Sequence, residues 1–129
     1  MTTKRTATSE MYGAYDVVVV PFPYSDRLAE KRRPALVISS SSLERYGVLW
    51  VAMITSAANE PWSCDVRIDD LHTAGLPSAS VVRPAKIAAI EPTRVLRRAG
   101  ALNSPTARKV AQHLRRFLAA GAPSRSRSR

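Results

Sequence analysis

The sequence predicts a small, mainly β domain, either a barrel or a sandwich, followed by one C-terminal helix. Two observations lead to this fold class. Short runs rich in valine and isoleucine alternate with clusters of proline, glycine, serine and asparagine, which is the pattern of strands separated by turns. The chain has 129 residues, enough to bury one hydrophobic core but not two. We therefore expect a single, strongly bent antiparallel sheet.

Six runs have the composition of strands, and each is bordered by turn-forming residues. They span residues 15–20, 35–39, 48–55, 65–68, 80–83 and 86–90. The first run leads into the proline-rich segment 21–24 and a charged loop up to position 32, which predicts a connection there. In the third run, Trp50 is interpreted as a core residue.

One segment, residues 105–119, has the pattern of an amphipathic helix. Ser104 is a suitable N-cap, Pro105 suits the first helical position, and Gly121 would stop the helix just past its end. Its apolar positions Val110, Leu114, Phe117 and Leu118 recur at helical spacing, and we expect Val110, Leu114 and Phe117 to pack on the sheet. The basic residues Arg108, Lys109, Arg115 and Arg116 lie on or beside the opposite face, which is either solvated or a binding surface.

The two ends of the chain differ in composition from the part between them. Residues 1–12 are polar and lack apolar periodicity, so we interpret them as a flexible N-terminal extension. Residues 121–129 form a low-complexity tail of arginine and serine, either a solvated segment or a nucleic-acid-binding arm. The folded domain is expected over residues 13–120.

The charge of the chain favours a polyanionic partner. Lysine and arginine number 20 against 10 acidic residues, a formal net charge of +10. The single cysteine, Cys64, and two histidines far apart do not build a disulfide or a zinc site, so we expect no metal or other cofactor and a cytoplasmic location. Every apolar run is far shorter than the roughly 18 residues of a membrane helix, so no membrane partner is expected.

Polar residues at the predicted strand ends are the candidates for a functional site, because familiar catalytic motifs are absent from the sequence. Arg33 precedes Pro34 at the start of the second strand, and Thr55 and Ser56 close the third. The residue before a proline is extended, so Arg33 can project into a cleft that the two hydroxyl groups also border. The alternative is that Arg33 is an ordinary surface charge and Thr55 an ordinary strand residue.

Four sequence blocks resemble the MazF/PemK-like toxins in content, order and spacing. They are Asp-Val-Val-Val-Val-Pro-Phe-Pro-Tyr-Ser-Asp (16–26), Lys-Arg-Arg-Pro-Ala-Leu-Val-Ile-Ser (31–39), Ala-Met-Ile-Thr-Ser (52–56) and Gly-Leu-Pro-Ser-Ala-Ser-Val-Val-Arg-Pro-Ala-Lys (75–86). The resemblance covers about residues 13–118. It implies a small SH3-like barrel with a C-terminal helix, usually a homodimer, that acts as a metal-independent, sequence-selective endoribonuclease in a toxin–antitoxin pair.

The resemblance also implies roles for particular residues. Catalytic roles fall to Arg33, Thr55 and Arg83, and Ser56 would line the RNA groove. The further RNA-binding candidates are Tyr24, Lys31, Arg32 and Lys86. The chain departs from the family at Tyr15, where glycine is common. It also has Ala85 where some members carry an acidic residue, so a mechanism that needs this carboxylate cannot be transferred.

The residue types fit RNA cleavage without a metal ion, in which the substrate's own 2′-hydroxyl group attacks phosphorus. The Arg33 guanidinium can bind two phosphoryl oxygens of the doubly charged phosphorane and stays charged at working pH. The Thr55 hydroxyl can donate a further hydrogen bond to these oxygens. Arginine is a poor acid or base, so proton transfer needs another group. The candidates are Asp26, Glu30 and His72.

Two other functions remain open from the sequence. A toxin with the same barrel could poison DNA gyrase by protein contact, and a basic barrel could bind RNA without cutting it. Such a binder usually stacks bases on aromatic residues, which are only 6% of this chain. The stacking candidates are Tyr24, Tyr46 and Trp62. For the ribonuclease we expect single-stranded RNA and a cognate antitoxin as partners, with an acidic antitoxin segment covering the catalytic residues.

Overall fold

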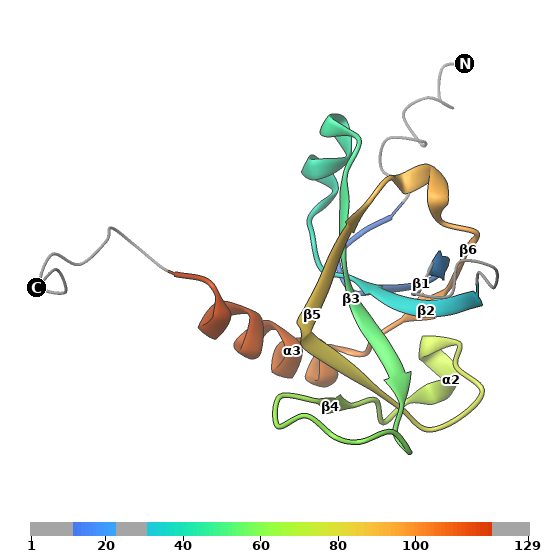
Figure 1. The fold of residues 1–129 in the computed structure, drawn as a ribbon, viewed down its shortest axis with the longest axis vertical. Helices are drawn as coiled ribbons and strands as arrows, with labels where there is room; N and C mark the ends of the chain where they lie inside the picture. Colours follow the sequence, from blue (N-terminus) through green and yellow to red (C-terminus); the bar gives the residue numbers. More distant parts are fainter. Residues whose placement is uncertain (1–11, 23–30, 120–129) are drawn as a thin grey trace, which may run out of the picture.

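The computed structural model describes residues 12–22 and 31–119 and has the predicted fold class, mainly β with a C-terminal helix (Figure 1). The strands are β1 (Asp16–Phe22), β2 (Lys31–Val37), β3 (Leu49–Ser56), β4 (Val66–Arg67), β5 (Ser80–Ile90) and β6 (Arg97–Ala101). The helices are α2 (Leu71–Ala74) and α3 (Ser104–Phe117), with short 3₁₀ turns η1 (Ser41–Tyr46) and η2 (Pro92–Arg94). In the described part of the chain, six strands form one antiparallel sheet in the order β4-β5-β3-β2-β1-β6.

The sheet is curled into a half-barrel, and both of its faces are buried. In Figure 1, β3 and β5 run steeply through the molecule while β1 and β2 cross them. Along a strand, successive side chains point to opposite faces. Val17 packs in a cluster with Val110 of α3, on what we call the helix face. Its neighbour Val18 packs with Val37 and Val51 in a second cluster, on what we call the inner face.

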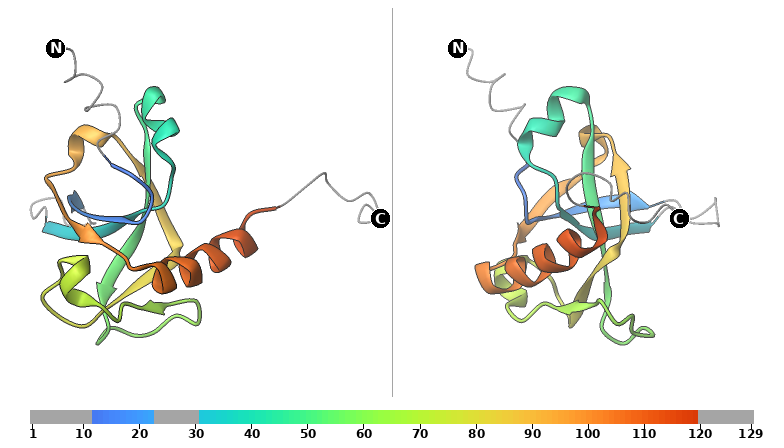
Figure 2. Two further views of the ribbon diagram at one scale, coloured as in Figure 1. Left: turned by 180° about the vertical axis from the view of Figure 1, so that it is seen from behind. Right: turned by 90° about the vertical axis from the view of Figure 1, so that its left-hand side faces the viewer.

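The helix face is covered by α2, which contacts β6, and by α3, which contacts β4 and β5, and both helices pack into one hydrophobic cluster (Figure 2). Ala74 of α2 and Val110 of α3 are both fully buried there. The inner face is closed by the bend of the sheet itself and by Tyr12, which is 9% exposed. Tyr12, the last residue of the expected N-terminal extension, is therefore part of the packed domain.

Prolines lie within three strands, and this explains one wrong prediction. The expected strands 80–83 and 86–90 are a single strand, β5, with Pro84 inside it. Opposite β5, Ala52 pairs with Ile87 whereas Met53 pairs with Arg83, so residues 84–86 form a bulge that has no partner in β3. Proline has no N–H group to donate and is therefore tolerated at such a bulge. Pro34 is similarly placed, because the pairing of β2 with β3 begins only at Ala35.

Two elements are not evident from the sequence. Strand β6 contains no β-branched residue, yet it forms the sheet edge next to β1. Helix α2 begins after Asp70, whose side chain accepts a hydrogen bond from the Thr73 N–H group, and it ends at Gly75 with φ 74°. A Cβ atom on Gly75 would overlap the backbone of Ala99 in β6, so only glycine allows this close approach.

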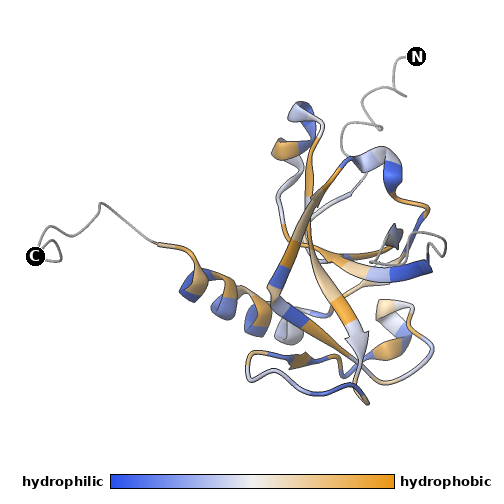
Figure 3. Cartoon of the chain, viewed as in Figure 1, coloured by the Kyte–Doolittle hydropathy of each residue, from blue (hydrophilic) through white to orange (hydrophobic). Residues whose placement is uncertain are grey.

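Helix α3 was predicted correctly in position but not in its cap. Asn103 is the N-cap, because its side chain accepts a hydrogen bond of 3.1 Å from the Thr106 N–H group, and Ser104 is already helical. Figure 3 shows hydrophilic and hydrophobic bands alternating along the helix, as an amphipathic segment requires. Gly121, the expected stop, lies outside the described residues.

The core predictions for two aromatic residues were wrong. Phe117 is 50% exposed and Trp50 is 44% exposed, whereas Val110 is fully buried and Leu114 packs against the core. Phe117 is in the last turn of α3, which extends past the sheet (Figure 2). Trp50 is in β3 and borders the open groove beside this end of α3, so neither ring is covered.

Tyr15, at the position where the family that the sequence resembles commonly has glycine, lies directly before β1. This residue has φ 72°, in the left-handed region that favours glycine. The conformation costs a non-glycine residue roughly 1 to 2 kcal/mol. It is held by two backbone hydrogen bonds, from the Tyr15 N–H group to the Val37 carbonyl (2.7 Å) and from the Leu102 N–H group to the Tyr15 carbonyl (3.0 Å).

Candidate active site

Arg33 and Thr55 lie at the same end of two neighbouring strands. Ala35 of β2 is opposite Met53 of β3, and each candidate is two residues beyond this pair in the same direction. Because side chains two residues apart share a face, Arg33 follows Ala35 and Thr55 follows Met53 onto the inner face. The tertiary structure thus brings the predicted arginine and hydroxyl group to one rim of the half-barrel.

The two side chains differ in their surroundings. Arg33 is opposite Val20 of β1 and half-buried, and its Nε atom is inaccessible to solvent. The Thr55 hydroxyl accepts a hydrogen bond of 2.6 Å from the Asn59 side-chain amide. A hydroxyl group that accepts in this way keeps its own proton to donate. Ser56 is exposed at the end of β3, and its Oγ atom accepts a hydrogen bond from the Ala58 N–H group.

Arg83 also lies on the inner face, opposite Met53, which is two residues further from the end of β3 than Thr55. Its guanidinium is bound by Asp65 through two hydrogen bonds of 2.9 and 3.0 Å, and it also donates to the Glu60 carbonyl at 3.0 Å. The hydrogen bond from Arg83 holds the pKa of Asp65 below its usual value, and the same bond raises the pKa of Arg83. The side chain is therefore engaged by the protein itself.

The predicted RNA-binding residues divide between the two faces. Lys31 is exposed in β2 and shares the face of Arg33, whereas Arg32 alternates to the opposite face. Arg32 there lines a second concavity with Gly75 and Arg97. Lys86 is exposed in the bulge of β5. Tyr24 lies outside the described residues.

The proton-transfer candidates are not assembled around Arg33 and Thr55 in the part of the chain that the structure describes. His72 is exposed in α2, and this helix packs on the helix face of the sheet, the side away from Arg33. Asp26 and Glu30 lie outside the described residues. Both belong to the connection between β1 and β2, which ends directly before the strand that carries Arg33.

Sequence reasoning did not find the residues that surround Arg83. Asp65 and Arg83 are 18 positions apart, and only the pairing of β4 with β5 brings them together. Trp62 was a candidate for base stacking only, yet its ring lies 4.5 Å from the Arg83 guanidinium carbon. Asn59, which contacts Thr55, gave no signal because isolated asparagines in loops are common turn residues.

In residues 12–22 and 31–119, no group of three or more histidine, cysteine, aspartate or glutamate side chains is arranged to hold a metal ion. None of the helices in these ranges combines the length and the hydrophobicity that crossing a membrane requires.

Comparison with known proteins places this chain in a family. Residues 14–118 match the family described as PemK-like, MazF-like toxin of type II toxin–antitoxin systems. Because the match covers most of the chain, the protein belongs to this family. A search of curated proteins gives no match.

Solved structures of this family have the same fold. The chain is similar to Mycobacterium tuberculosis toxin MazF-mt6, with 20% identity, a TM-score of 0.62 and coverage of 77% of this chain and 91% of that one. It is similar to a MazE–MazF structure from Deinococcus radiodurans, with 20% identity, a TM-score of 0.65 and coverage of 80% and 91%. It is also similar to an endoribonuclease in complex with its cognate antitoxin from a mycobacterial species, with 16% identity, a TM-score of 0.65 and coverage of 87% and 99%. At these identities the likeness establishes the fold.

Proposed function

We propose that this protein is an endoribonuclease of the mRNA interferase type, the toxin of a toxin–antitoxin pair, which cuts single-stranded RNA in the cytoplasm. The observation that carries the proposal is the placement of Arg33 and Thr55 at the same end of β2 and β3 on one face. Membership of the MazF-like family supports the same activity. The resemblance is also the basis for expecting that cleavage needs no metal ion and is selective for particular RNA sequences.

The geometry supports transition-state stabilisation as the main catalytic contribution. The half-buried Arg33 guanidinium can bind two phosphoryl oxygens, and shielding from water strengthens the interaction. The Thr55 hydroxyl, oriented by Asn59, has a proton to donate to the same oxygens. The 2′-hydroxyl group then attacks phosphorus, and the 5′-oxygen leaves with the electrons of the broken P–O bond.

Proton transfer is assigned to the carboxylates of the β1–β2 connection. His72 is on the other side of the sheet, which favours Asp26 or Glu30 as the group that activates the 2′-hydroxyl. Their connection joins the strand of Arg33 directly. Asp26→Asn and Glu30→Gln are expected to differ in activity at neutral pH, with the larger loss marking the base.

A cleavage assay with a long RNA in EDTA tests the proposal. Discrete fragments are expected from the wild type. Arg33→Ala should slow cleavage about 30- to 1,000-fold, which corresponds to about 2 to 4 kcal/mol for the loss of one preorganised donor. Thr55→Ala should lose less, and Thr55→Ser, which keeps the hydroxyl group, should lose least. Full activity of Arg33→Ala would refute the site. A gel shift of the RNA without fragments would indicate a non-catalytic binder. If the protein neither cuts nor shifts the RNA, a toxin that acts by protein contact is favoured.

An acidic antitoxin is proposed as the natural inhibitor. The chain is strongly basic, and RNA and an Asp/Glu-rich segment would compete for the same cationic rim. Two of the similar structures contain an antitoxin. Adding the neighbouring-gene product to the cleavage assay should stop cutting, with weaker inhibition as salt screens the exposed charges. Tight binding that leaves cutting unchanged would exclude inhibition by occlusion of the active site.

Homodimerisation is proposed from the resemblance and from an exposed apolar surface. Trp50, Ile87 and Leu118 are 44%, 47% and 66% exposed and border one groove of about 270 Å³ beside α3. Apolar groups gathered in this way favour association. Light scattering should give twice the chain mass of 14.1 kDa, and Trp50→Glu should give the monomer. A wild type that stays monomeric at micromolar concentration would contradict the proposal.

A further inference from the structure

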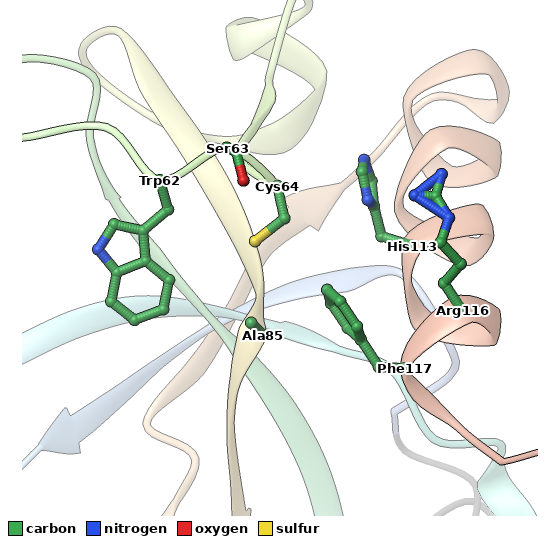
Figure 4. Close-up of a pocket in the computed structure, with 7 residues that line it drawn as sticks. All are labelled: Trp62, Ser63, Cys64, Ala85, His113, Arg116 and Phe117. Atoms are coloured by element: carbon green, nitrogen blue, oxygen red, sulfur yellow. The ribbon is translucent and has the colours of Figure 1, made fainter.

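Another concave surface, separate from the one lined by Arg32, lies between the loop joining β3 to β4 and the C-terminal half of α3. It is an open pocket of about 640 Å³. Figure 4 shows Trp62 of the loop on one side, His113, Arg116 and Phe117 of α3 on the other, and Ala85 of β5 between them. Trp62 is 43% exposed and Phe117 is 50% exposed, so two large aromatic side chains border the pocket.

The loop side of this pocket is held by the Arg83–Asp65 ion pair. The pair is bidentate, and the two side chains are only 11% and 10% exposed. Arg83 also donates to the Glu60 carbonyl. Two parallel charge-assisted hydrogen bonds fix orientation as well as distance, so this pair ties the loop rigidly to β5.

The same ion pair sets the position of the Trp62 side chain. The Arg83 guanidinium carbon lies 4.5 Å from the centre of the indole ring, a cation–π contact that covers one side of the ring. Asp65 holds the Trp62 backbone in both directions: its Oδ2 atom accepts from the Trp62 N–H group at 2.9 Å, and its own N–H group donates to the Trp62 carbonyl at 3.0 Å. The exposed part of the indole is thus presented by a preorganised support.

The loop side of the pocket lies near the candidate active site. Ala35 is opposite Met53, Met53 is opposite Arg83, and Arg83 binds Asp65, which directly precedes β4. From β2 to β4 this row crosses three strand spacings, about 14 Å. The row itself is buried and α3 lies on the other face of the sheet, so RNA that spans both sites has to pass around the β4 edge, where Trp62 is exposed.

The charge of the pocket fits a nucleotide. Helix α3 contains four lysine or arginine residues and no acidic residue, and Arg116 and His113 are its polar groups at the pocket. A flat aromatic surface beside a guanidinium matches a base joined to a phosphate. An acidic peptide would use the cation but leave the aromatic surfaces unpartnered.

We propose that this pocket is a nucleotide subsite for the RNA, in which Trp62 stacks on a base, Arg116 binds a phosphate, and Arg83 with Asp65 positions the indole. The inference rests on the proposed function, because it says where a further nucleotide of the same RNA binds. Arg83 is then a positioning residue, and Arg33 and Thr55 are the catalytic residues.

Fluorescence tests the stacking contact without depending on cleavage. The chain has two tryptophans, so Trp50→Phe leaves Trp62 as the single emitter. A fully 2′-O-methylated single-stranded oligoribonucleotide cannot be cut, because its nucleophile is blocked. Titration with this oligonucleotide is expected to quench the Trp62 emission.

Variants then measure the contribution of each group to binding of the same oligonucleotide. Trp62→Ala should weaken binding about 5- to 100-fold, and Trp62→Phe should lose much less. Arg116→Ala should reduce the slope of log affinity against log salt by about one. The matched control is Arg45→Ala, an exposed cation on η1, at the far end of the molecule from the pocket (Figure 1). This control should bind as the wild type does.

The role of Arg83 is tested by kinetics on a cleavable RNA. Arg83→Lys keeps the charge but loses the bidentate pair, so a positioning role predicts a raised KM with kcat nearly unchanged. A drop in kcat with KM unchanged would instead make Arg83 a catalytic residue and overturn this part of the proposal. Melting temperatures of both proteins show whether the variant is folded.

Several results would refute the subsite. Equal binding by the wild type and Trp62→Ala, or unchanged Trp62 emission, would show that no base stacks there. Quenching that follows protein concentration or an oligoglutamate peptide instead of RNA would assign the pocket to a second copy or a protein partner. If the wild type binds with quenching but does not cut RNA, the proposed function fails and the subsite stands. If the wild type cuts RNA and Trp62→Ala binds normally, only the subsite fails.

Discussion

Replacing Asp65 by asparagine should destabilise the fold measurably, because the substitution removes the charge that Arg83 faces. Asp65 accepts two hydrogen bonds from Arg83 and one from the Trp62 N–H group, at 2.9 to 3.0 Å, and both charged side chains are about nine-tenths buried. Asparagine has the same shape but only one acceptor oxygen. A hydrogen bond to a charged group contributes about 1.5 to 3 kcal/mol, and breaking a buried pair costs about 3 to 5 kcal/mol. Since this pair lies near the surface, we expect a loss of about 2 to 3 kcal/mol.

Urea unfolding at matched protein concentration measures this loss, and thermal unfolding should show it as a fall in Tm of about 8 to 12 °C. The control is Asp69→Asn, an exposed aspartate on the same segment, which should stay within about 0.5 kcal/mol of the wild type. A free energy of unfolding of Asp65→Asn within this margin at pH 7 would refute the assignment of Asp65 and Arg83 as a stabilising pair.

The difference between wild type and Asp65→Asn should also depend on pH. The hydrogen bond from Arg83 lowers the pKa of Asp65 in the folded state below its ordinary value of about 3.9. The stabilisation is therefore fully present above pH 4 to 5, and it is lost as pH falls through the lowered folded-state pKa. Other carboxylates titrate in both proteins and cancel. A difference that stays constant from pH 7 to pH 3 would contradict this origin.

Two matched pairs of substitutions test the backbone features. Gly75→Ala should lower the free energy of unfolding, measured in urea, by more than Gly47→Ala does. Both glycines have φ near 75°, but only at Gly75 would a Cβ atom overlap the backbone of Ala99. The Gly47 variant should lose about 1 kcal/mol, and equal losses would refute the close approach. Asn103→Ala should cost about 1 kcal/mol through the lost cap of α3, whereas Ser104→Ala should be nearly neutral, and the reverse order would return the cap to Ser104.

Much of the fold follows from local sequence pattern. The runs of valine and isoleucine in β1, β2 and β3 and the periodicity of Val110 and Leu114 in α3 report which side chains leave water, and this depends mainly on neighbours in the chain. Arg33 and Thr55 were candidates for the same reason: a proline and a strand end mark their positions. The fold class and the family were therefore predictable from the sequence.

The pairing of distant segments was not. The bulge that makes β5 one strand, the edge position of β6 and the contact of Gly75 with β6 all depend on the register of partners far away in the sequence. The exposure of Trp50 and Phe117 depends on the packing of α3, because both residues border the open groove beside this helix. The sequence by itself determined which residues are apolar and which are extended or helical, because these are local properties. Only the tertiary structure decided which charge meets which, as in the pairing of Arg83 with Asp65, because cross-strand contacts join residues that no spacing rule connects.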